Sequence, residues 1–416
     1  MIPPVSVIIV SRGRPDALLT ALAGVAQSDH PTLEVVVVAC PAGVSEVRKS
    51  RFQGQVKLAE FDEPNISRAR NLGLALAAAP VVAFLDDDAV PEPTWASRLA
   101  APFADPKVAQ AGGYVRGRNG ISFQWTAMEV DATGADHSLG VPVDRVSLHL
   151  GRGDRAVKTQ GTCCAFRRDV LADAGGFDPA FRFYLDEADV NLRLAATGQL
   201  TAVVPMAQVV HGYAASPRRR PDRVPLDLGE IGASFAAFLR RHAPTGTWAG
   251  ALAGFLGDQR RRLMRHMVSG GLEPGEVRRM MRGLENGLED GLTNRPPTRL
   301  APIGPPLAPF CAMPGTGPRP GWVILSTPGN RAEAETAART ALAAGAVVTL
   351  LQLSKGARAH WLGLRADGIW VQAGGVWGRS DRAQPRLQRW SFAQRAVAEA
   401  ARLASMRPAD HILSDP

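Results

Sequence analysis

Residues 65–95 read NISRARNLGLALAAAPVVAFLDDDAVPEPTW, and this stretch decides the fold. Its apolar, strand-like run ends in three consecutive aspartates, Asp86, Asp87 and Asp88. Three carboxylates held close together cost on the order of several kcal/mol unless a cation or hydrogen-bond donors offset their repulsion. In an extended strand Asp86 and Asp88 would share a face. The stretch therefore predicts a metal site, the alternative being a solvated acidic turn before Pro91.

Strand-length apolar runs alternate with helical patterns around this stretch. Runs at 5–10, 33–39 and 81–85 are separated by helices expected near 15–27 and 65–79. Such alternation predicts a mostly parallel sheet with helices on both faces. Sheets of this kind bind ligands beyond the carboxyl ends of their strands, and the three aspartates follow such an end.

Five blocks in the order expected for family 2 glycosyltransferases carry a resemblance that spans roughly residues 4–216. The ARN-x-G helix and the D-x-D strand of 65–95 are two of them. The others are VSVIIVSRGRPDALLTAL (5–22), GTCCAFRRDVLADAGGFDPAFRFYLDEADVNLRLAATG (161–198) and VVHGYAAS (209–216). The resemblance implies an α/β fold of the GT-A nucleotide-diphospho-sugar transferase type, a mostly parallel mixed sheet between helices. It also implies transfer of a sugar from a nucleoside-diphosphate sugar to a hydroxyl, with inversion.

The resemblance implies metal ligands and donor contacts as well. Asp88 and His211 would hold Mn²⁺ or Mg²⁺, with Asp86 as a donor-side partner that shares the metal. Bound to the leaving diphosphate, the ion would neutralise developing negative charge. Position alone suggests that Ser11 and Arg14 contact the base or ribose.

Two further arginines and an acidic group complete the predicted site. Arg68 and Arg70 are candidates for the diphosphate or ribose, and a surface ion pair is the alternative for either. The catalytic base is expected in the acidic group at 186–189, with Glu187 as first choice and Asp186 as second. Asp189 is expected to be a helix-start acid or the i,i+4 partner of Arg193.

One departure from the family's sequence pattern concerns the residue that recognises the nucleobase. Where the family commonly has a base-reading Asp after the second strand, this chain has Ala39-Cys40-Pro41. Uracil recognition by that carboxylate is therefore absent. Asn71 and Gly73, in contrast, are expected to set how their helix packs.

The chain divides into four segments by composition. A catalytic domain at 1–216 is followed by a helical extension at 217–292, a Pro/Gly-rich linker at 293–320 and a small Rossmann-like α/β unit at 321–416. The last is weakly similar to the amino-terminal half of GT-B-type glycosyltransferases. Since those enzymes bind the donor mainly through their other half, this unit is expected to bind acceptor, to form a homodimer or to be vestigial.

The charge balance indicates which classes of partner the protein is expected to bind. With 48 basic and 39 acidic residues the net charge is +9, carried by arginine clusters that favour phosphate-bearing ligands or anionic lipid. Nucleic acid is not expected, because aromatic residues are not interleaved with these clusters. Basic helices between 255 and 285 carry methionines among their arginines. They suit peripheral contact with an anionic membrane or a solvated bundle.

The four cysteines and the hydropathy indicate the compartment. No cysteines stand in CxxC spacing, and no run of 18 apolar residues occurs. We therefore expect a cytoplasmic protein, at the inner face of the membrane if the basic helices dock there. The predicted function is hexosyl or deoxyhexosyl transfer to a glycan or lipid-linked acceptor in cell-surface polysaccharide or glycoconjugate synthesis. The alternative is a catalytically degenerate scaffold that recruits partner transferases.

Overall fold

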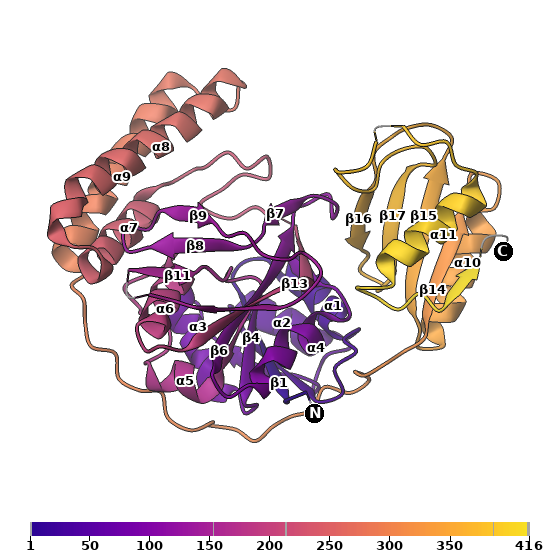
Figure 1. Ribbon diagram of the computed structural model, residues 1–416, viewed down its shortest axis with the longest axis horizontal. Coiled ribbons are helices and arrows are strands. Elements are labelled where there is room, and N and C mark those ends of the chain that lie inside the picture. Colours follow the sequence, from indigo (N-terminus) through magenta and orange to yellow (C-terminus); the bar gives the residue numbers. More distant parts are fainter. Residues whose placement is uncertain (1, 153, 213, 386, 414–416) are drawn as a thin grey trace.

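The computed structural model of the chain describes residues 2–152, 154–212, 214–385 and 387–413. A central α/β body carries a helical hairpin that projects on one side and a second α/β unit on the other (Figure 1). These parts are connected by a long extended segment that runs along the body.

The central sheet has ten strands in the order β10-β13-β6-β12-β4-β1-β2-β3, with β5 attached to β13 and β7 to β6. The strands β1 to β4 and the pair β6 and β13 are parallel, whereas β12 runs antiparallel between the two groups. This arrangement confirms the predicted mixed, mainly parallel GT-A fold. The bounds are β1 (Val5–Ser11), β2 (Leu33–Ala39), β3 (Lys57–Glu60), β4 (Val81–Asp86), β5 (Ala89–Pro91), β6 (Val108–Arg116), β7 (Phe123–Trp125), β10 (Ser147–Leu150), β12 (Cys164–Arg167) and β13 (Leu200–His211).

Both faces of this sheet are buried, which explains the continuous apolar runs. In β1, Val7 and Ile9 enter one core cluster, and Ile8 between them enters another, as alternation along a strand requires. The covering helices are α1 (Pro15–Val25), α2 (Pro41–Lys49), α3 (Ile66–Leu76), α4 (Trp95–Ala100), α5 (Arg168–Asp173) and α6 (Asp186–Ala195), and the 3-10 turn η1 spans Ala101–Ala104.

Helix α3 approaches the sheet closely at Gly73. A Cβ atom there would lie 2.4 Å from Ile8 Cγ2, so no larger residue fits without movement. On the same helix the Asn71 amide donates to Phe177 O (2.7 Å) and accepts from Phe177 N (2.8 Å). Both residues therefore set the packing of α3, as predicted.

A small sheet and three helices extend the body. The sheet is β11-β8-β9, with β8 (Met128–Asp131), β9 (Asp136–Ser138) and β11 (Arg155–Val157). The helices are α7 (Gly229–His242), α8 (Trp248–Val268) and α9 (Pro274–Asn294), with η2 at Thr245–Thr247. Glycines on α9 let it touch α7 backbone to backbone. Figure 1 shows the hairpin of α8 and α9 reaching beyond the body.

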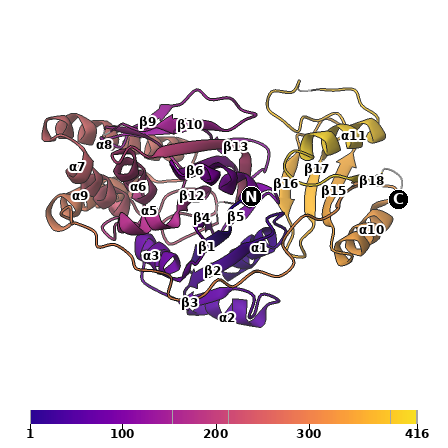
Figure 2. The ribbon, with the colours of Figure 1, turned by 60° about the horizontal axis from the view of Figure 1, so that its bottom comes forward.

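The segment 295–320, here called the strap, has no helix or strand assigned, as its proline and glycine content predicts. It is nevertheless held along the body by backbone hydrogen bonds, including Ile303 N to Ala172 O (2.9 Å) and Met313 N to Leu33 O (2.8 Å). Cys311 N donates to the buried carboxylate of Glu34 (2.9 Å). The strap thereby leads the chain from α9 to the opposite side of the body (Figure 2).

The C-terminal unit, residues 321–413 here, contains a five-stranded sheet in the order β16-β17-β15-β14-β18. Four strands are parallel, and β16 is antiparallel to β17. The strands are β14 (Gly321–Ser326), β15 (Val347–Ser354), β16 (Trp361–Leu364), β17 (Trp370–Gly375) and β18 (His411–Leu413), and the helices are α10 (Arg331–Ala343) and α11 (Phe392–Leu403). The pattern is Rossmann-like, as predicted, although the sequence did not indicate β16 and β18.

Candidate functional site

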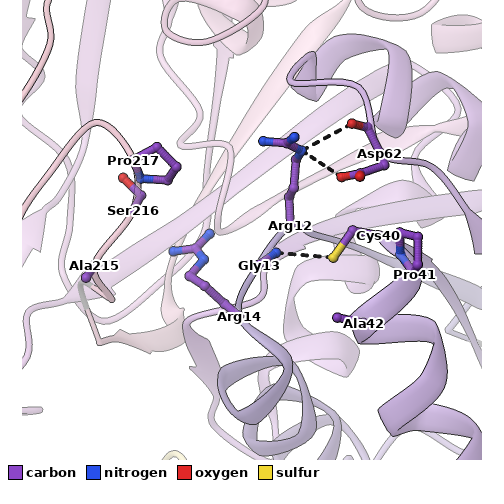
Figure 3. Close-up of a pocket in the computed structure, with 10 residues that line it drawn as sticks. All are labelled: Arg12, Gly13, Arg14, Cys40, Pro41, Ala42, Asp62, Ala215, Ser216 and Pro217. Carbon is purple, nitrogen blue, oxygen red and sulfur yellow. Dashed lines mark hydrogen bonds and ion pairs between the residues drawn. The ribbon is translucent and has the colours of Figure 1, made fainter.

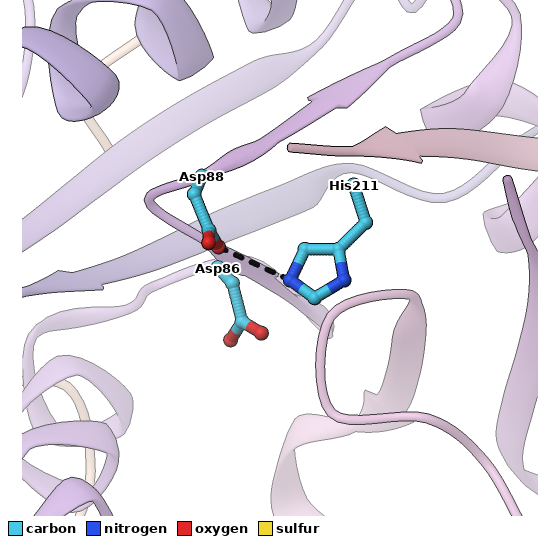
Figure 4. A group of neighbouring side chains, drawn as sticks. All are labelled: Asp86, Asp88 and His211. Atoms are coloured by element: carbon cyan, nitrogen blue, oxygen red, sulfur yellow. Dashed lines mark ion pairs between the residues drawn. The ribbon is translucent and has the colours of Figure 1, made fainter. Parts of the chain in front are cut away.

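Asp86, Asp88 and His211 converge at one edge of the central sheet (Figure 4). Each offers one ligand atom, and these atoms all lie within 4.8 Å of one another. The convergence was predicted, but the reason given for it was wrong. Strand β4 ends at Asp86, and a turn at 87–88, not strand alternation, brings Asp88 round. The antiparallel pairing of β5 with β13 then places His211 opposite Ala89.

Asp88 is held in its ionised form. Its Oδ1 lies 3.2 Å from His211 Nε2, and its Oδ2 accepts from Arg14 Nη1 (3.0 Å) and Ala214 N (2.7 Å). Burial alone would raise the pKa of Asp88. The hydrogen bond and charge of His211, together with Arg14 and the Ala214 amide, outweigh burial and lower the pKa well below its ordinary value.

His211 is oriented by β7. Its Nδ1 lies 3.0 Å from Gln124 Oε1, and its ring stacks on Trp125 with centroids 5.9 Å apart. Because the Gln124 oxygen only accepts, Nδ1 carries the hydrogen. In this structure Nε2 faces Asp88 as a hydrogen-bond donor. A bound metal would take the place of that hydrogen, because a neutral ring with Nδ1 protonated has its lone pair on Nε2. Sequence reasoning missed Gln124 and Trp125, because no motif spacing marks them.

Asp87 is fully buried and is not merely a spacer between the other two carboxylates. Its Oδ2 accepts from Ser11 Oγ (2.7 Å) and Arg14 Nε (3.1 Å). Burial raises the pKa of Asp87 to about 7, although Arg14 opposes the rise. Ser11 and Arg14, predicted as nucleotide contacts, thus also anchor the aspartate turn.

A cavity of about 460 Å³ lies beside this group (Figure 3). Arg14 links the two, since it lines the cavity and bonds Asp88. The Cys40 thiol accepts from Gly13 N (3.2 Å), and Asp62 pairs with Arg12 (2.9 Å). The cavity is lined by Arg12, Gly13, Arg14, Cys40, Pro41, Ala42, Asp62, Ala215, Ser216 and Pro217. Asp62, which follows β3, thus gives the cavity a carboxylate that the sequence analysis did not predict.

Arg70 joins the aspartate turn to the acidic group at 186–189. Its guanidinium is buried, lies 3.4 Å from Asp86, donates to Gly161 O (3.1 Å) and forms an ion pair with Asp186. Arg68, two residues earlier, faces solvent and pairs with exposed Glu63 (2.9 Å). The structure therefore brings Arg70 into the site and Arg68 into a surface ion pair, and a donor contact from Arg68 stays a prediction.

The acidic group opens α6 after an unusual turn. Tyr184 and Leu185 both have positive φ, 83° and 62°, a strained backbone that often marks functional sites. Asp186 is buried against Arg70, whereas Glu187 is half-buried. Burial, followed by the neighbouring charge of Asp186, raises the pKa of Glu187 to about 7. A carboxyl group with such a pKa exchanges a proton near neutral pH.

Asp189 has a structural role, as predicted. Its Oδ2 accepts from Arg193 Nε four residues later (2.9 Å), and its Oδ1 lies 2.9 Å from His242 Nε2 on α7. Asp178, the other acid of this region, caps Ala180 N (2.9 Å) and pairs with Arg241.

Residues 3–221 match the model of the family described as "Glycosyltransferase like family 2". The chain belongs to this family. The match covers the central sheet and the residues that converge at its edge, so the chain is a glycosyltransferase of family 2.

Individual relatives resemble parts of this family 2 glycosyltransferase. The O-antigen biosynthesis protein RfbC of Myxococcus xanthus is 27% identical over 256 residues, 59% of this chain and 20% of that protein. The pre-mycofactocin glycosyltransferase of Mycobacterium tuberculosis is 30% identical over 156 residues, 35% of this chain and 29% of that protein. The N-acetylglucosaminyl-diphospho-decaprenol L-rhamnosyltransferase of the same organism is 38% identical over 61 residues, 15% of this chain and 20% of that protein. This chain thus spans less than a third of each relative.

Among solved structures, the crystal structure of GalNAc-T7 with UDP, GalNAc and Mn²⁺ is similar with a TM-score of 0.42 and 16% identity. The similarity covers 58% of this glycosyltransferase and 52% of that chain. Within the described residues of the glycosyltransferase, helices that combine the length and apolar character needed to cross a bilayer are absent.

Proposed function

We propose that this protein is a metal-dependent, inverting glycosyltransferase that moves a hexosyl or deoxyhexosyl group from a nucleoside-diphosphate sugar to a hydroxyl. One observation carries the proposal: two sets of contacts, one through Arg14 and one through Arg70, meet at Asp88 and Asp86, whose ligand atoms lie within 4.8 Å of each other. Arg14 connects the cavity to Asp88, and Arg70 connects Asp86 to Asp186 beside Glu187. A donor lying along these contacts would present its anomeric carbon near Glu187.

The donor half of the site suits a nucleoside diphosphate. The cavity has the volume of a small-ligand pocket, and its lining includes two arginines, Arg12 beside Asp62 and Arg14 beside Asp88. Two carboxylates and an imidazole are a suitable ligand set for Mn²⁺ or Mg²⁺. When bound, such an ion would supply Lewis-acid stabilisation of the leaving diphosphate. Asp86, tied to Arg70, would contact the sugar side of the donor.

The acceptor half supplies the base. An acceptor hydroxyl attacks the anomeric carbon while Glu187 takes its proton, and the bond from that carbon to the diphosphate oxygen breaks on the opposite face. A displacement of this kind inverts the configuration. Asp186 is engaged in an ion pair with Arg70, so it would hold Arg70 in place, and its negative charge, after burial, keeps the pKa of Glu187 high.

The class of acceptor is inferred from the relatives and from the hairpin. One relative is named for O-antigen biosynthesis and another for transfer of L-rhamnose to N-acetylglucosaminyl-diphospho-decaprenol. These names support a glycan or lipid-linked acceptor in cell-surface polysaccharide or glycoconjugate synthesis.

The outward face of α8 supports contact with the membrane that would hold a lipid-linked acceptor. There Met264 is 38% and Val268 84% exposed, beside the exposed side chains of Arg260, Arg261 and Arg265. Apolar side chains among exposed arginines suit an anionic bilayer surface.

The alternative is a scaffold that keeps the fold without catalysis. The missing base-reading Asp, where this chain has Ala39-Cys40-Pro41, supports it, whereas the complete Asp86, Asp88 and His211 group and the raised pKa of Glu187 oppose it. A scaffold would tolerate loss of Glu187 and of Asp186 in a test of glycan synthesis in cells, and an enzyme would not tolerate loss of Glu187.

The proposal is tested by a screen of nucleotide sugars with purified protein, with and without Mn²⁺. We expect one donor to raise the melting temperature in the presence of Mn²⁺ and to be hydrolysed slowly. Glu63→Gln, which removes an exposed carboxylate outside the site, serves as the control and should behave as wild type. If no sugar nucleotide shifts the melting temperature in the presence of metal, the proposal is wrong.

A further inference from the structure

The metal-ligand residues Asp88 and His211 stand at one end of a two-stranded ribbon formed by β5 and the last residues of β13. His211 pairs with Ala89, Val210 with Val90 and Val209 with Pro91. Strand β5 has only three residues and pairs with β13. The last residues of β13 also pair with β6, Val209 with Val115 and Val210 with Arg116, so β13 is held by the central sheet. The position of the short β5 depends in part on what packs against it.

The C-terminal unit packs behind it. Val90 and Val210, paired on one face of the ribbon, join a buried apolar cluster with Val347, Leu362 and Trp370 of the C-terminal unit. Because side chains alternate along a strand, this face is opposite the one that carries His211. The C-terminal unit thus packs against the face of the ribbon opposite His211.

A buried ion pair fixes the other end of β5. Glu92, the residue after β5, accepts from Arg407 through both carboxylate oxygens, 2.6 Å from Nη2 and 2.9 Å from Nε. Both side chains are 0% exposed, and the Arg407 guanidinium lies 3.9 Å from the centroid of the Trp370 ring. Two parallel hydrogen bonds and a stacked guanidinium set position and angle more tightly than a single contact does.

The unit also holds the loop that leads into β7. Leu362 N on β16 donates to Asn119 O (2.8 Å), and Arg382 Nε donates to Ser122 Oγ (2.8 Å). Ser122 is two residues before Gln124, the partner of His211 Nδ1. In Figure 1, β16 faces the tip of β7 across this contact.

We propose that the C-terminal unit is a positioning element for the metal site, and that Arg407 and Arg382 are positioning residues acting through Glu92 and Ser122. The unit contacts the strand and loop residues next to Asp88, His211 and Gln124. Among its described residues, none belongs to the candidate ligand group. This role rests on the metal dependence proposed above and gives the unit a function in sugar transfer without a donor site.

The test measures Mn²⁺ affinity directly, by the electron paramagnetic resonance signal of unbound Mn²⁺. The full chain is titrated alone and with each of UDP, dTDP, GDP, CDP and ADP. Arg407→Lys keeps a positive charge for Glu92 but loses the two-point contact and the stacking. We expect its Kd for Mn²⁺ to rise about tenfold, as is usual when the support of a metal ligand is lost. Arg382→Ala, at an exposed contact, should raise the Kd by less.

The control is Arg365→Ala. Arg365 also lies in the C-terminal unit, but its ion pair is with Glu335 on the unit's own helix α10 (2.8 Å). This variant should leave the Mn²⁺ affinity unchanged. Asp88→Ala defines binding at the site itself.

The outcomes separate this inference from the proposed function. An Arg407→Lys protein that melts cooperatively and binds Mn²⁺ like wild type overturns the positioning role. If Arg407→Lys does not fold, an unchanged Kd for Arg382→Ala overturns it. If wild type shows no Mn²⁺ binding that depends on Asp88, the proposed metal dependence fails and this inference fails with it.

Discussion

Replacement of Glu187 by Gln should lower turnover and raise stability at the same time. Glutamine keeps the size of the side chain but cannot take the proton, so kcat should fall by about 10²- to 10⁴-fold. The KM for the donor should change little, because the described lining of the cavity does not include Glu187. A loss in kcat alone would place Glu187 at the chemical step.

The raised pKa gives the direction of both pH effects. In wild type, kcat/KM should rise about tenfold per pH unit up to about 7 and then level off, because only the ionised carboxylate acts as a base. The free energy of unfolding, in contrast, should fall as pH rises. A carboxyl group with a raised folded-state pKa loses stability as pH rises from its ordinary value of 4.5 through about 7. The full shift corresponds to about 3 kcal/mol, and partial exposure of Glu187 reduces it to about 1–2 kcal/mol.

These effects are measured by initial rates and by thermal melting between pH 5 and 8. Glu187→Gln should melt higher than wild type at pH 8 and equally at pH 5. Asp186→Asn removes the neighbouring negative charge, so the rising limb of the activity profile should shift to lower pH. A Glu187→Gln enzyme that retains more than about a tenth of wild-type kcat would refute the reasoning, as would a wild-type profile without a break near pH 7.

Three further predictions concern the metal, the core and the hairpin. Asp88→Ala should abolish both Mn²⁺-dependent turnover and the Mn²⁺-dependent thermal shift caused by the donor; a variant that keeps either would exclude Asp88 as a ligand. Gly73→Ala should destabilise the protein by about 1–3 kcal/mol in denaturant titration, because its Cβ would overlap Ile8, whereas Gly254→Ala in open space on α8 should stabilise it by up to about 1 kcal/mol. Wild type should sediment with phosphatidylglycerol vesicles and not with phosphatidylcholine vesicles. A Met264→Ser/Val268→Ser protein should sediment less, and equal binding by both proteins would contradict membrane contact through α8.

Much of the site could be predicted because it depends on local pattern. The apolar runs indicated the first strands and a mostly parallel sheet, and parallel strands place their carboxyl ends, hence Asp86 and Ser11, at one edge, as the pairing of β1 with β4 shows. The helical period also separates Arg70 from Arg68, since Arg70 shares the buried face of α3 with Ser67 and Leu74.

Other contacts leave no signal in the sequence near the residues that make them. Gln124 binds His211 across 87 positions, and its stretch carries no motif. The turn at 87–88 depends on hydrogen bonds that Ser11 and Arg14, at the end of β1 and just after it, donate to Asp87. A prediction from the strand pattern alone therefore extended β4 too far. The buried pair of Glu92 and Arg407 and the packing of the C-terminal unit could not be predicted. Such contacts depend on the shapes that the surfaces of the two units have once both are folded.

The pair of Glu92 and Arg407 has a consequence for synthesis of the protein. The two residues are 315 positions apart in the chain. A chain synthesised only as far as residue 216 contains every proposed catalytic and metal-binding side chain, yet β5 lacks the support of Arg407. On the positioning role proposed above, a prematurely terminated chain would carry the whole family 2 region and still bind the metal weakly.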